Sequence, residues 1–190
     1  MNNKYIILVL GIPGSGKTTF ANKLSIEMAG IPVICTDIVK AVYEEKNTKV
    51  LSKVSHNAWQ IVGECSDENI VIGYRIFSSE LFKYSYSLAQ KMLRTYNTVI
   101  IEGLGIDVSV IDDMPEQIIK VFLSNNDRQA GYLNKLSYRN NKENNWQKNA
   151  HSLELISKYI ENNLTIDKLL FKFDVSESDK YIKLIKESIR

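Results

Sequence analysis

The residues with the clearest chemistry form a glycine-rich stretch. Residues 11–18 read GIPGSGKT and match the pattern GxxxxGK[ST] in full. In such a loop the glycines let successive backbone N–H groups turn toward phosphate oxygens, Lys17 reaches the β- and γ-phosphates, and the Thr18 hydroxyl ligates Mg²⁺. A helix expected to begin at Lys17 adds the positive end of its dipole. The motif predicts ATP and Mg²⁺ as cofactors, with Thr18 as metal ligand and the nucleotide held by Gly11, Pro13, Gly14, Ser15, Gly16, Lys17, Thr18 and Thr19.

Asp37 is the second candidate, since it directly follows the apolar stretch 33–35. Transfer of a γ-phosphoryl group to an alcohol needs charge neutralisation on the transferring oxygens and a group that orients the hydroxyl and takes its proton. Lys17 and Mg²⁺ meet the first need, and Asp37 is the candidate for the second. Thr36 and Asp37 also precede a predicted helix, where they would act as an N-cap pair. A carboxylate can serve both purposes.

Three further charged residues stand at positions where a ligand could be held. Glu102 ends an apolar run and is equally well interpreted as a partner of Mg²⁺, a substrate ligand or a cap. Arg75 could recognise an anionic acceptor with its guanidinium, or form an exposed salt bridge. Arg128 is the preferred lid arginine over the nucleotide, in a segment rich in Asn. Arg139 lies about three helical turns further on, and whether it joins Arg128 stays open.

These residues must be positioned by an alternation of apolar runs and helical segments. Such a pattern predicts βαβ units, a parallel sheet and polar strand ends that share one cleft. Helices are expected to begin at Lys17 and Thr36, and Ser176 is expected to cap the last one. Residues 66–69 are interpreted as a loop. The predicted strands are 4–10, 33–35, 98–101, 118–123 and 170–175, and the other helices are about 56–63, 79–96 and 153–162.

Composition narrows the functional class. The 190 residues suit one domain, 1–190, and a net charge of +2 does not favour nucleic acid as a partner, although it leaves that partner open. No apolar run approaches the ~20 residues that span a bilayer, so no membrane partner and a cytoplasmic location are expected. Cys35 and Cys65 have neither zinc-ligand nor disulfide spacing, and Cys35 is interpreted as a small buried hydrophobe.

A phosphate-binding loop alone does not separate a kinase from a GTPase or a molecular motor. No guanine-reading NKxD segment stands at a predicted strand end, and the third strand ends in Ile-Ile-Glu-Gly rather than in an Asp-Glu pair. Small size, the acidic residue after the second strand and the arginine-bearing segment after the fourth favour a small phosphotransferase.

Five segments together resemble the P-loop kinases related to 2-phosphoglycerate kinase, which are similar to adenylate-kinase-like and zeta-toxin-like phosphotransferases. The segments are GIPGSGKTT, VICTDIVKAV, IVIGYRIFSSELF, VIIEGLGID and FLSNNDRQAGYLNKLSYRNN. The resemblance implies an ATP-dependent kinase of the α/β P-loop class with a five-stranded parallel sheet of order 2-3-1-4-5. It also implies a substrate cap over about residues 38–96 and a lid over about 124–149. In such enzymes the aspartate matching Asp37 handles the acceptor hydroxyl.

The chain departs from the family pattern at two places. Lys40 stands where the family tends to have Arg, and a lysine loses the bidentate grip of a guanidinium. Leu104 and Gly105 follow the Glu-Gly of the third strand, where the family tends to place a histidine. Both departures lie where substrate would be held, so the resemblance carries kinase activity and not 2-phosphoglycerate itself.

The expected function is therefore transfer of the γ-phosphate of ATP to a hydroxyl of a small, anionic metabolite. The expected catalytic residues are Lys17, Asp37 and Arg128, and the expected acceptor-binding residues are Asp37, Lys40, Arg75 and Glu102. Two alternatives stay open: a kinase of polynucleotides, nucleotides or UDP-sugars, and an ATP-binding switch without a kinase substrate. The acceptor and the oligomeric state are not indicated by the sequence.

Overall fold

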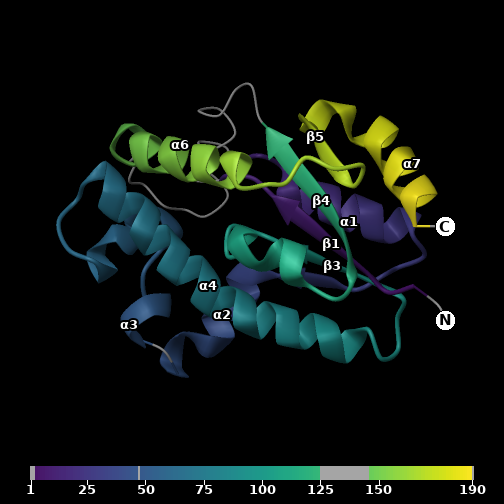
Figure 1. Ribbon diagram of the computed structural model, residues 1–190, viewed down its shortest axis with the longest axis horizontal. Coiled ribbons are helices and arrows are strands. Elements are labelled where there is room, and N and C mark those ends of the chain that lie inside the picture. The colour runs from purple at the N-terminus through teal and green to yellow at the C-terminus, as the bar shows by residue number, and fades with distance from the viewer. Residues whose placement is uncertain (1–2, 47, 125–145, 190) are drawn as a thin grey trace.

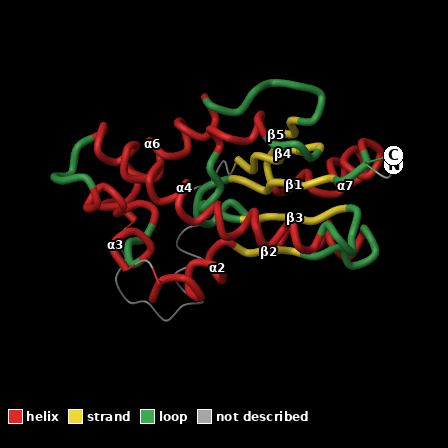
Figure 2. The backbone as a smooth tube through the Cα atoms, turned by 60° about the horizontal axis from the view of Figure 1, so that its bottom comes forward, coloured by secondary structure: helices red, strands yellow, loops and turns green. Residues whose placement is uncertain are grey.

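The fold is built around a fully parallel five-stranded sheet. The computed structural model describes residues 3–46, 48–124 and 146–189. The sheet has the strand order β2-β3-β1-β4-β5, which Figure 2 shows from bottom to top. This confirms the predicted α/β class and strand order. The strands are β1 (Tyr5–Leu10), β2 (Val33–Cys35), β3 (Thr98–Glu102), β4 (Gln117–Ser124) and β5 (Leu170–Asp174).

Helices cover both faces of this sheet (Figure 1). Helices α1 and α7 pack on one face, and α4 and α6 pack on the other. The α-helices are α1 (Lys17–Glu27), α2 (Thr36–Tyr43), α3 (Thr48–Leu51), α4 (Asp67–Met92), α6 (Trp146–Asn162) and α7 (Ser178–Ser188). Shorter 3-10 helices are η1 (Glu44–Lys46), η2 (Ser55–Ile61), η3 (Val108–Asp113) and η4 (Val175–Glu177). Among the described residues, none of the helices combines the length and apolarity needed to cross a membrane.

Strand β1 lies at the centre of the sheet, and its sequence is apolar throughout. Every residue of β1 is buried, because successive side chains point to opposite faces and both faces are covered. Ile6 and Leu8 belong to the core under α4 and α6, whereas Ile7 and Val9 belong to the core under α1 and α7. The sheet is therefore a fixed layer from which the polar strand ends project.

A buried lysine fastens the sheet to the loop before β5. Lys120 lies on β4 with its side chain 3% exposed, and its ammonium group donates to Asp167 Oδ2 at 2.6 Å and to the carbonyl of Thr165 at 3.1 Å. Asp112 at the end of η3 lies 3.5 Å away. The side chains of Asp112 and Asp167 are both exposed, so only the lysine end of each ion pair is buried.

Three local predictions were wrong in their boundaries. The predicted loop 66–69 is instead the start of α4, which begins about 12 residues before the predicted residue 79. The Ser66 side chain caps this helix by accepting a hydrogen bond from the Asn69 amide at 3.2 Å. Helix α6 likewise begins at Trp146 rather than near Leu153. Ser176 does not cap the last helix. Asp174 accepts from the Ser176 amide instead, and a 3-10 turn precedes α7.

The segment predicted as a substrate cap, residues 38–96, consists of most of α2 followed by η1, α3, η2 and α4. Glycine 73 sets how closely α4 approaches η2, because a Cβ at this position would lie 2.4 Å from the backbone of Ala58. The function of this segment as a cap stays a prediction. Most of the predicted lid, residues 125–145, lies outside the described residues.

Candidate functional site

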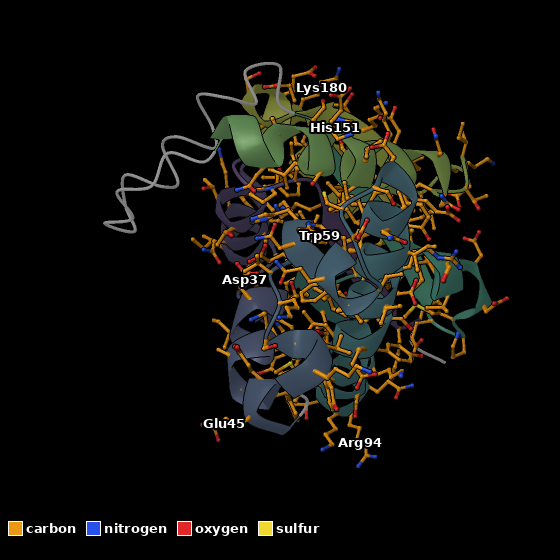
Figure 3. All side chains as sticks on the ribbon, turned by 90° about the vertical axis from the view of Figure 1, so that its left-hand side faces the viewer. Asp37, Glu45, Trp59, Arg94, His151 and Lys180 are labelled. Carbon is orange, nitrogen blue, oxygen red and sulfur yellow. The ribbon has the colours of Figure 1, made fainter. Side chains whose placement is uncertain are left out.

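Three neighbouring strands end beside the glycine-rich loop. The parallel register pairs Val9 of β1 with Glu102 of β3, and Glu102 with Cys35 of β2. The loop begins two residues after Val9, and Asp37 lies two residues after Cys35. Figure 3 faces the side of the molecule toward which the strands run and labels Asp37 between the purple N-terminal segments and the blue ribbon of α2. The fold therefore brings the loop, Glu102 and Asp37 to one edge.

The loop has the backbone shape that phosphate binding requires. Gly11, Gly14 and Gly16 have φ values of 142°, 86° and 87°, a region that favours glycine. At two of these positions space is also closed to a side chain. A Cβ on Gly11 would lie 2.6 Å from the carbonyl oxygen of Leu123, and one on Gly16 would lie 2.6 Å from Val175 Cγ2. The glycines at these positions are therefore required both by the backbone conformation and by the close packing around the loop.

The remaining loop residues surround the start of α1. Lys17 is buried and its ammonium group donates to the carbonyl of Ile12 at 2.8 Å, so its charge lies against the loop. The Ser15 hydroxyl is buried with no hydrogen-bond partner among the described residues. Pro13 is half-buried, and Thr19 is exposed on the first turn of α1. A cationic group at a helix N-terminus suits a polyphosphate anion.

Thr18 and Glu102 supply the oxygens that suit a divalent cation. The Thr18 hydroxyl donates to Glu102 Oε1 at 3.1 Å, although the two residues are 84 positions apart in the chain. Glu102 is 2% exposed. A hydroxyl and a carboxylate beside a phosphate cradle are hard oxygen ligands of the kind that Mg²⁺ takes together with phosphate and water. The donor set therefore fits the predicted Mg²⁺ and favours, for Glu102, a place at the cation.

Cys35 is the residue whose place was not foreseen. It is half-buried at the end of β2, level with Glu102 on the neighbouring strand. Burial, and then the hydrogen bond and negative charge of Glu102, raise the pKa of this thiol to about 11. The sulfur therefore keeps its proton at neutral pH. Its interpretation as a small buried hydrophobe misses this place beside Glu102, and the available signal was its position at the end of β2.

Asp37 and Lys40 share one side of α2. Asp37 is exposed in the first turn, where the helix dipole favours a carboxylate. Cys35, and not the predicted pair Thr36 and Asp37, is the N-cap residue. Lys40 lies three residues further on, one helical turn away, and its ammonium group donates to Glu44 Oε2 at 3.0 Å.

The loop after β3 closes tightly over the start of α2. Gly103 has a φ of 136°, and a Cβ there would lie 1.8 Å from the Thr36 hydroxyl oxygen. The same hydroxyl accepts a hydrogen bond from the Gly105 amide at 3.4 Å. A Cβ on Gly105 would lie 2.3 Å from Leu81 of α4. These glycines are packing requirements that fix the distance between Glu102 and α2.

Arg75 lies in a separate groove of about 500 Å³ on the outer face of α4. Ile76 and Lys83 of α4 line this groove, and Asp107 after β3 closes it. Burial raises the pKa of Tyr159 on α6, and the positive charge of Arg75 opposes that rise. The neighbours of Arg75 are thus on α6 and in the loop after β3. Its predicted contact with an acceptor stays untested.

The predicted lid arginine cannot be placed. Arg128 lies outside the described residues, as does Arg139. The site that the structure does assemble consists of the glycine-rich loop, Thr18, Glu102, Cys35 and Asp37.

Comparisons with known proteins add information on the fold. No protein-family model and no curated protein sequence matches the chain. Solved structures do resemble it. A proposed kinase from Chloroflexus aurantiacus J-10-fl aligns over 98% of this chain and 98% of its own, with a TM-score of 0.59 and 16% identity. Shikimate kinase from Acinetobacter baumannii, in complex with shikimate, aligns over 98% of this chain and 94% of its own, with a TM-score of 0.53 and 16% identity. The shared feature is the fold, a parallel sheet covered by helices on both faces.

Proposed function

We propose that this chain is an ATP-dependent phosphotransferase that moves the γ-phosphate of ATP to a hydroxyl of a small, anionic metabolite. The contact between the Thr18 hydroxyl and the Glu102 carboxylate carries the proposal. This hydroxyl and carboxylate would supply oxygen ligands for a cation beside the glycine-rich loop, and the Asp37 carboxylate lies in the first turn of the neighbouring helix α2. The P-loop kinase fold is consistent with this chemistry.

Each residue of the site has a task in such a transfer. The loop amides bind the phosphate oxygens, and Lys17 moves its ammonium group from the Ile12 carbonyl to the γ-phosphate. Thr18 and Glu102 hold Mg²⁺, which neutralises charge on the phosphate oxygens when it is bound. Asp37 accepts the proton of the acceptor hydroxyl and orients that hydroxyl toward the γ-phosphate.

An anionic acceptor is proposed because of the cations beside Asp37. Lys40 is half-buried one turn along α2, where its ammonium group can exchange Glu44 for an acidic group of the acceptor. The proposed lid residue Arg128 would neutralise the phosphates from the opposite side. An acceptor like 2-phosphoglycerate is the finer form of the proposal, and shikimate, which the Acinetobacter enzyme binds, is a second acid worth testing.

The test is phosphate transfer by the purified full chain with Mg²⁺-ATP, read by mass spectrometry. The acceptor panel contains sugar acids, phosphoglycerates and shikimate, with oligonucleotides, nucleoside monophosphates and UDP-sugars as separate arms. We expect a phosphorylated product in the acid arm. Product only in the nucleotide or UDP-sugar arms would contradict the small-acid acceptor. ATP binding without acceleration by any acceptor would contradict the kinase and favour a nucleotide switch.

Variants then assign the roles. Asp37→Asn should lower kcat by about a hundredfold or more with ATP affinity unchanged, because the general base is lost and the cradle is not. Lys17→Ala should abolish turnover by removing charge stabilisation at the γ-phosphate. Asp113→Asn, an exposed carboxylate in η3, is the matched control and should leave both quantities unchanged. Parental turnover in Asp37→Asn would remove Asp37 from the mechanism.

A further inference from the structure

The groove beside Arg75 has two walls that come from distant parts of the chain. One wall is formed by Asp107 and Ser109, at the start of η3. The other is the outer face of α4, whose residues recur at helical spacing: Ile72, Arg75, Ile76, Ser79, Glu80 and Lys83. The volume of about 500 Å³ lies within the range of small-molecule sites. The groove can therefore hold a ligand of that size.

Packing holds the η3 wall against α4. Asp107 is 6% exposed, and its Oδ1 accepts hydrogen bonds from the Ser109 amide at 3.0 Å and from the Ser109 hydroxyl at 2.6 Å. Ile106 and Val108, on either side of Asp107, belong to the same hydrophobic core as Phe77 of α4. The wall is therefore fixed by the fold and does not depend on a bound ligand.

Arg75 is the charge that the groove leaves without an opposite charge. Among the described residues, Lys83 pairs with Glu80 at 2.9 Å, and no ion pair includes Arg75. Glu80 also accepts a hydrogen bond from the Tyr84 hydroxyl at 3.3 Å, and Asp107 accepts from Ser109. Both carboxylates of the groove thus have donors of their own. The exposed guanidinium is left to bind an anionic group, which it can do with two parallel hydrogen bonds.

The groove is apolar next to Arg75. Ile76 directly follows Arg75 and is 39% exposed, which is high for a large aliphatic side chain. Ile72 lies one helical turn before Ile76, so the two side chains are neighbours on the surface of α4. A ligand with an anionic group at Arg75 can place an apolar body over these two residues. A ligand with many anionic groups would instead be repelled by Glu80 and Asp107.

We propose that this groove is a second ligand site, which binds a small organic acid with one anionic group and an apolar body. Arg75 donates to the anionic group, and Ile72 and Ile76 contact the apolar body. None of the residues that line the groove belongs to the glycine-rich loop or to the strand ends beside it. The site therefore goes beyond the proposed function, since neither ATP nor the phosphoryl acceptor takes part. It also gives Arg75 a role other than the predicted contact with the acceptor.

The experiment uses two probes that differ only in the anionic group. Anilinonaphthalene sulfonate carries one anionic group on an apolar body, and phenylnaphthylamine has the same body without the sulfonate. Each is titrated by fluorescence into the full-length protein without nucleotide. Arg75→Gln removes the positive charge, and Ile76→Ser removes apolar surface. Both side chains are exposed, so the variants should fold. Arg94→Gln is the matched control, since Arg94 is an exposed arginine just beyond the end of α4.

We expect Arg75→Gln to weaken binding of the sulfonate probe by about tenfold or more, and to leave binding of the neutral probe unchanged, because only the charged hydrogen bonds are lost. Ile76→Ser should weaken binding of both probes. Arg94→Gln should match the parent, and Mg²⁺-ATP should not displace the sulfonate probe.

Three results would overturn the inference. Equal affinity of the sulfonate probe for the parent and for Arg75→Gln would remove the guanidinium from the site. Displacement of the probe by Mg²⁺-ATP would place it at the glycine-rich loop instead. A dimeric parent that becomes monomeric in Ile76→Ser would show that a second copy of the chain covers the groove.

Discussion

Replacement of Glu102 by Gln should separate its possible roles. The amide keeps an oxygen that accepts from Thr18, while the buried negative charge disappears. Since burial of a charge opposes folding, the ligand-free variant should be as stable as the parent or more stable. Its affinity for Mg²⁺-ATP should fall, because a neutral amide is a poor partner for a divalent cation.

The size of the effect follows from linkage. At a ligand concentration of about 100 times the dissociation constant, binding raises the free energy of unfolding by about 2.7 kcal/mol. A loss of affinity of about thirtyfold, within the range for metal-site residues, leaves about 0.9 kcal/mol. The difference of about 1.8 kcal/mol corresponds to about 4–7 °C of Tm for a domain of this size.

The assay is thermal unfolding of both proteins, with and without Mg²⁺-ATP, followed by circular dichroism. Glu116→Gln is the matched control: Glu116 also accepts a hydrogen bond, from Tyr86 at 2.7 Å, and it directly precedes β4 at the opposite end of the sheet. The control should keep the full ligand-induced rise in Tm. A Glu102→Gln protein that loses several kcal/mol without ligand and keeps the full rise with Mg²⁺-ATP would refute the reasoning and make Glu102 a structural cap.

Three further predictions concern stability, measured by urea unfolding. Gly16→Ala should lower the free energy of unfolding by about 2–5 kcal/mol, because the alanine is strained at a left-handed φ and its Cβ collides with Val175. Adding Val175→Ala should recover only the part due to the collision, about 1–3 kcal/mol, and no recovery would contradict the contact. Lys120→Ala should lower the free energy of unfolding by about 2–4 kcal/mol, mainly by leaving a cavity. Lys120→Met should recover most of this loss because the partner carboxylates stay hydrated, and an equal loss in both variants would contradict this reasoning. Burial and the Glu116 hydrogen bond raise the pKa of Tyr86 to about 12. The contribution of Tyr86 to the free energy of unfolding is therefore complete below pH 10 and is lost as pH rises from 10 to 12. Tyr86→Phe should flatten this fall in stability, and an unchanged slope would contradict the prediction.

The sheet could be predicted because its strands are buried on both faces. The run Tyr5–Leu10 is apolar at every position, which only a central parallel strand or a buried helix requires, and the phosphate-binding motif after it decides between the two. The glycine pattern of that motif also specifies its own backbone shape, so the loop and the position of Thr18 beside it follow from local sequence.

The errors share a physical cause, since tertiary contacts overrode local signals. Ser66 to Asn69 have turn composition, but Ser66 caps a helix whose buried face, including Tyr74 and Phe77, packs on the sheet. The position of Cys35 beside Glu102 depends on a register between residues 67 positions apart in the chain, which no local pattern encodes. The groove around Arg75 depends in the same way on where α4 and the loop after β3 meet.

The close contact between Gly103 and Thr36 limits which substitutions this sequence can accept. A side chain at position 103 meets two separate obstacles, the Thr36 hydroxyl and a backbone conformation that disfavours any residue but glycine. A smaller residue at position 36 would remove only the first. Two single substitutions, at positions 36 and 103 in either order, therefore leave the second obstacle in place, and changes to the proposed acceptor site must occur in α2 or in the residues beyond Gly103.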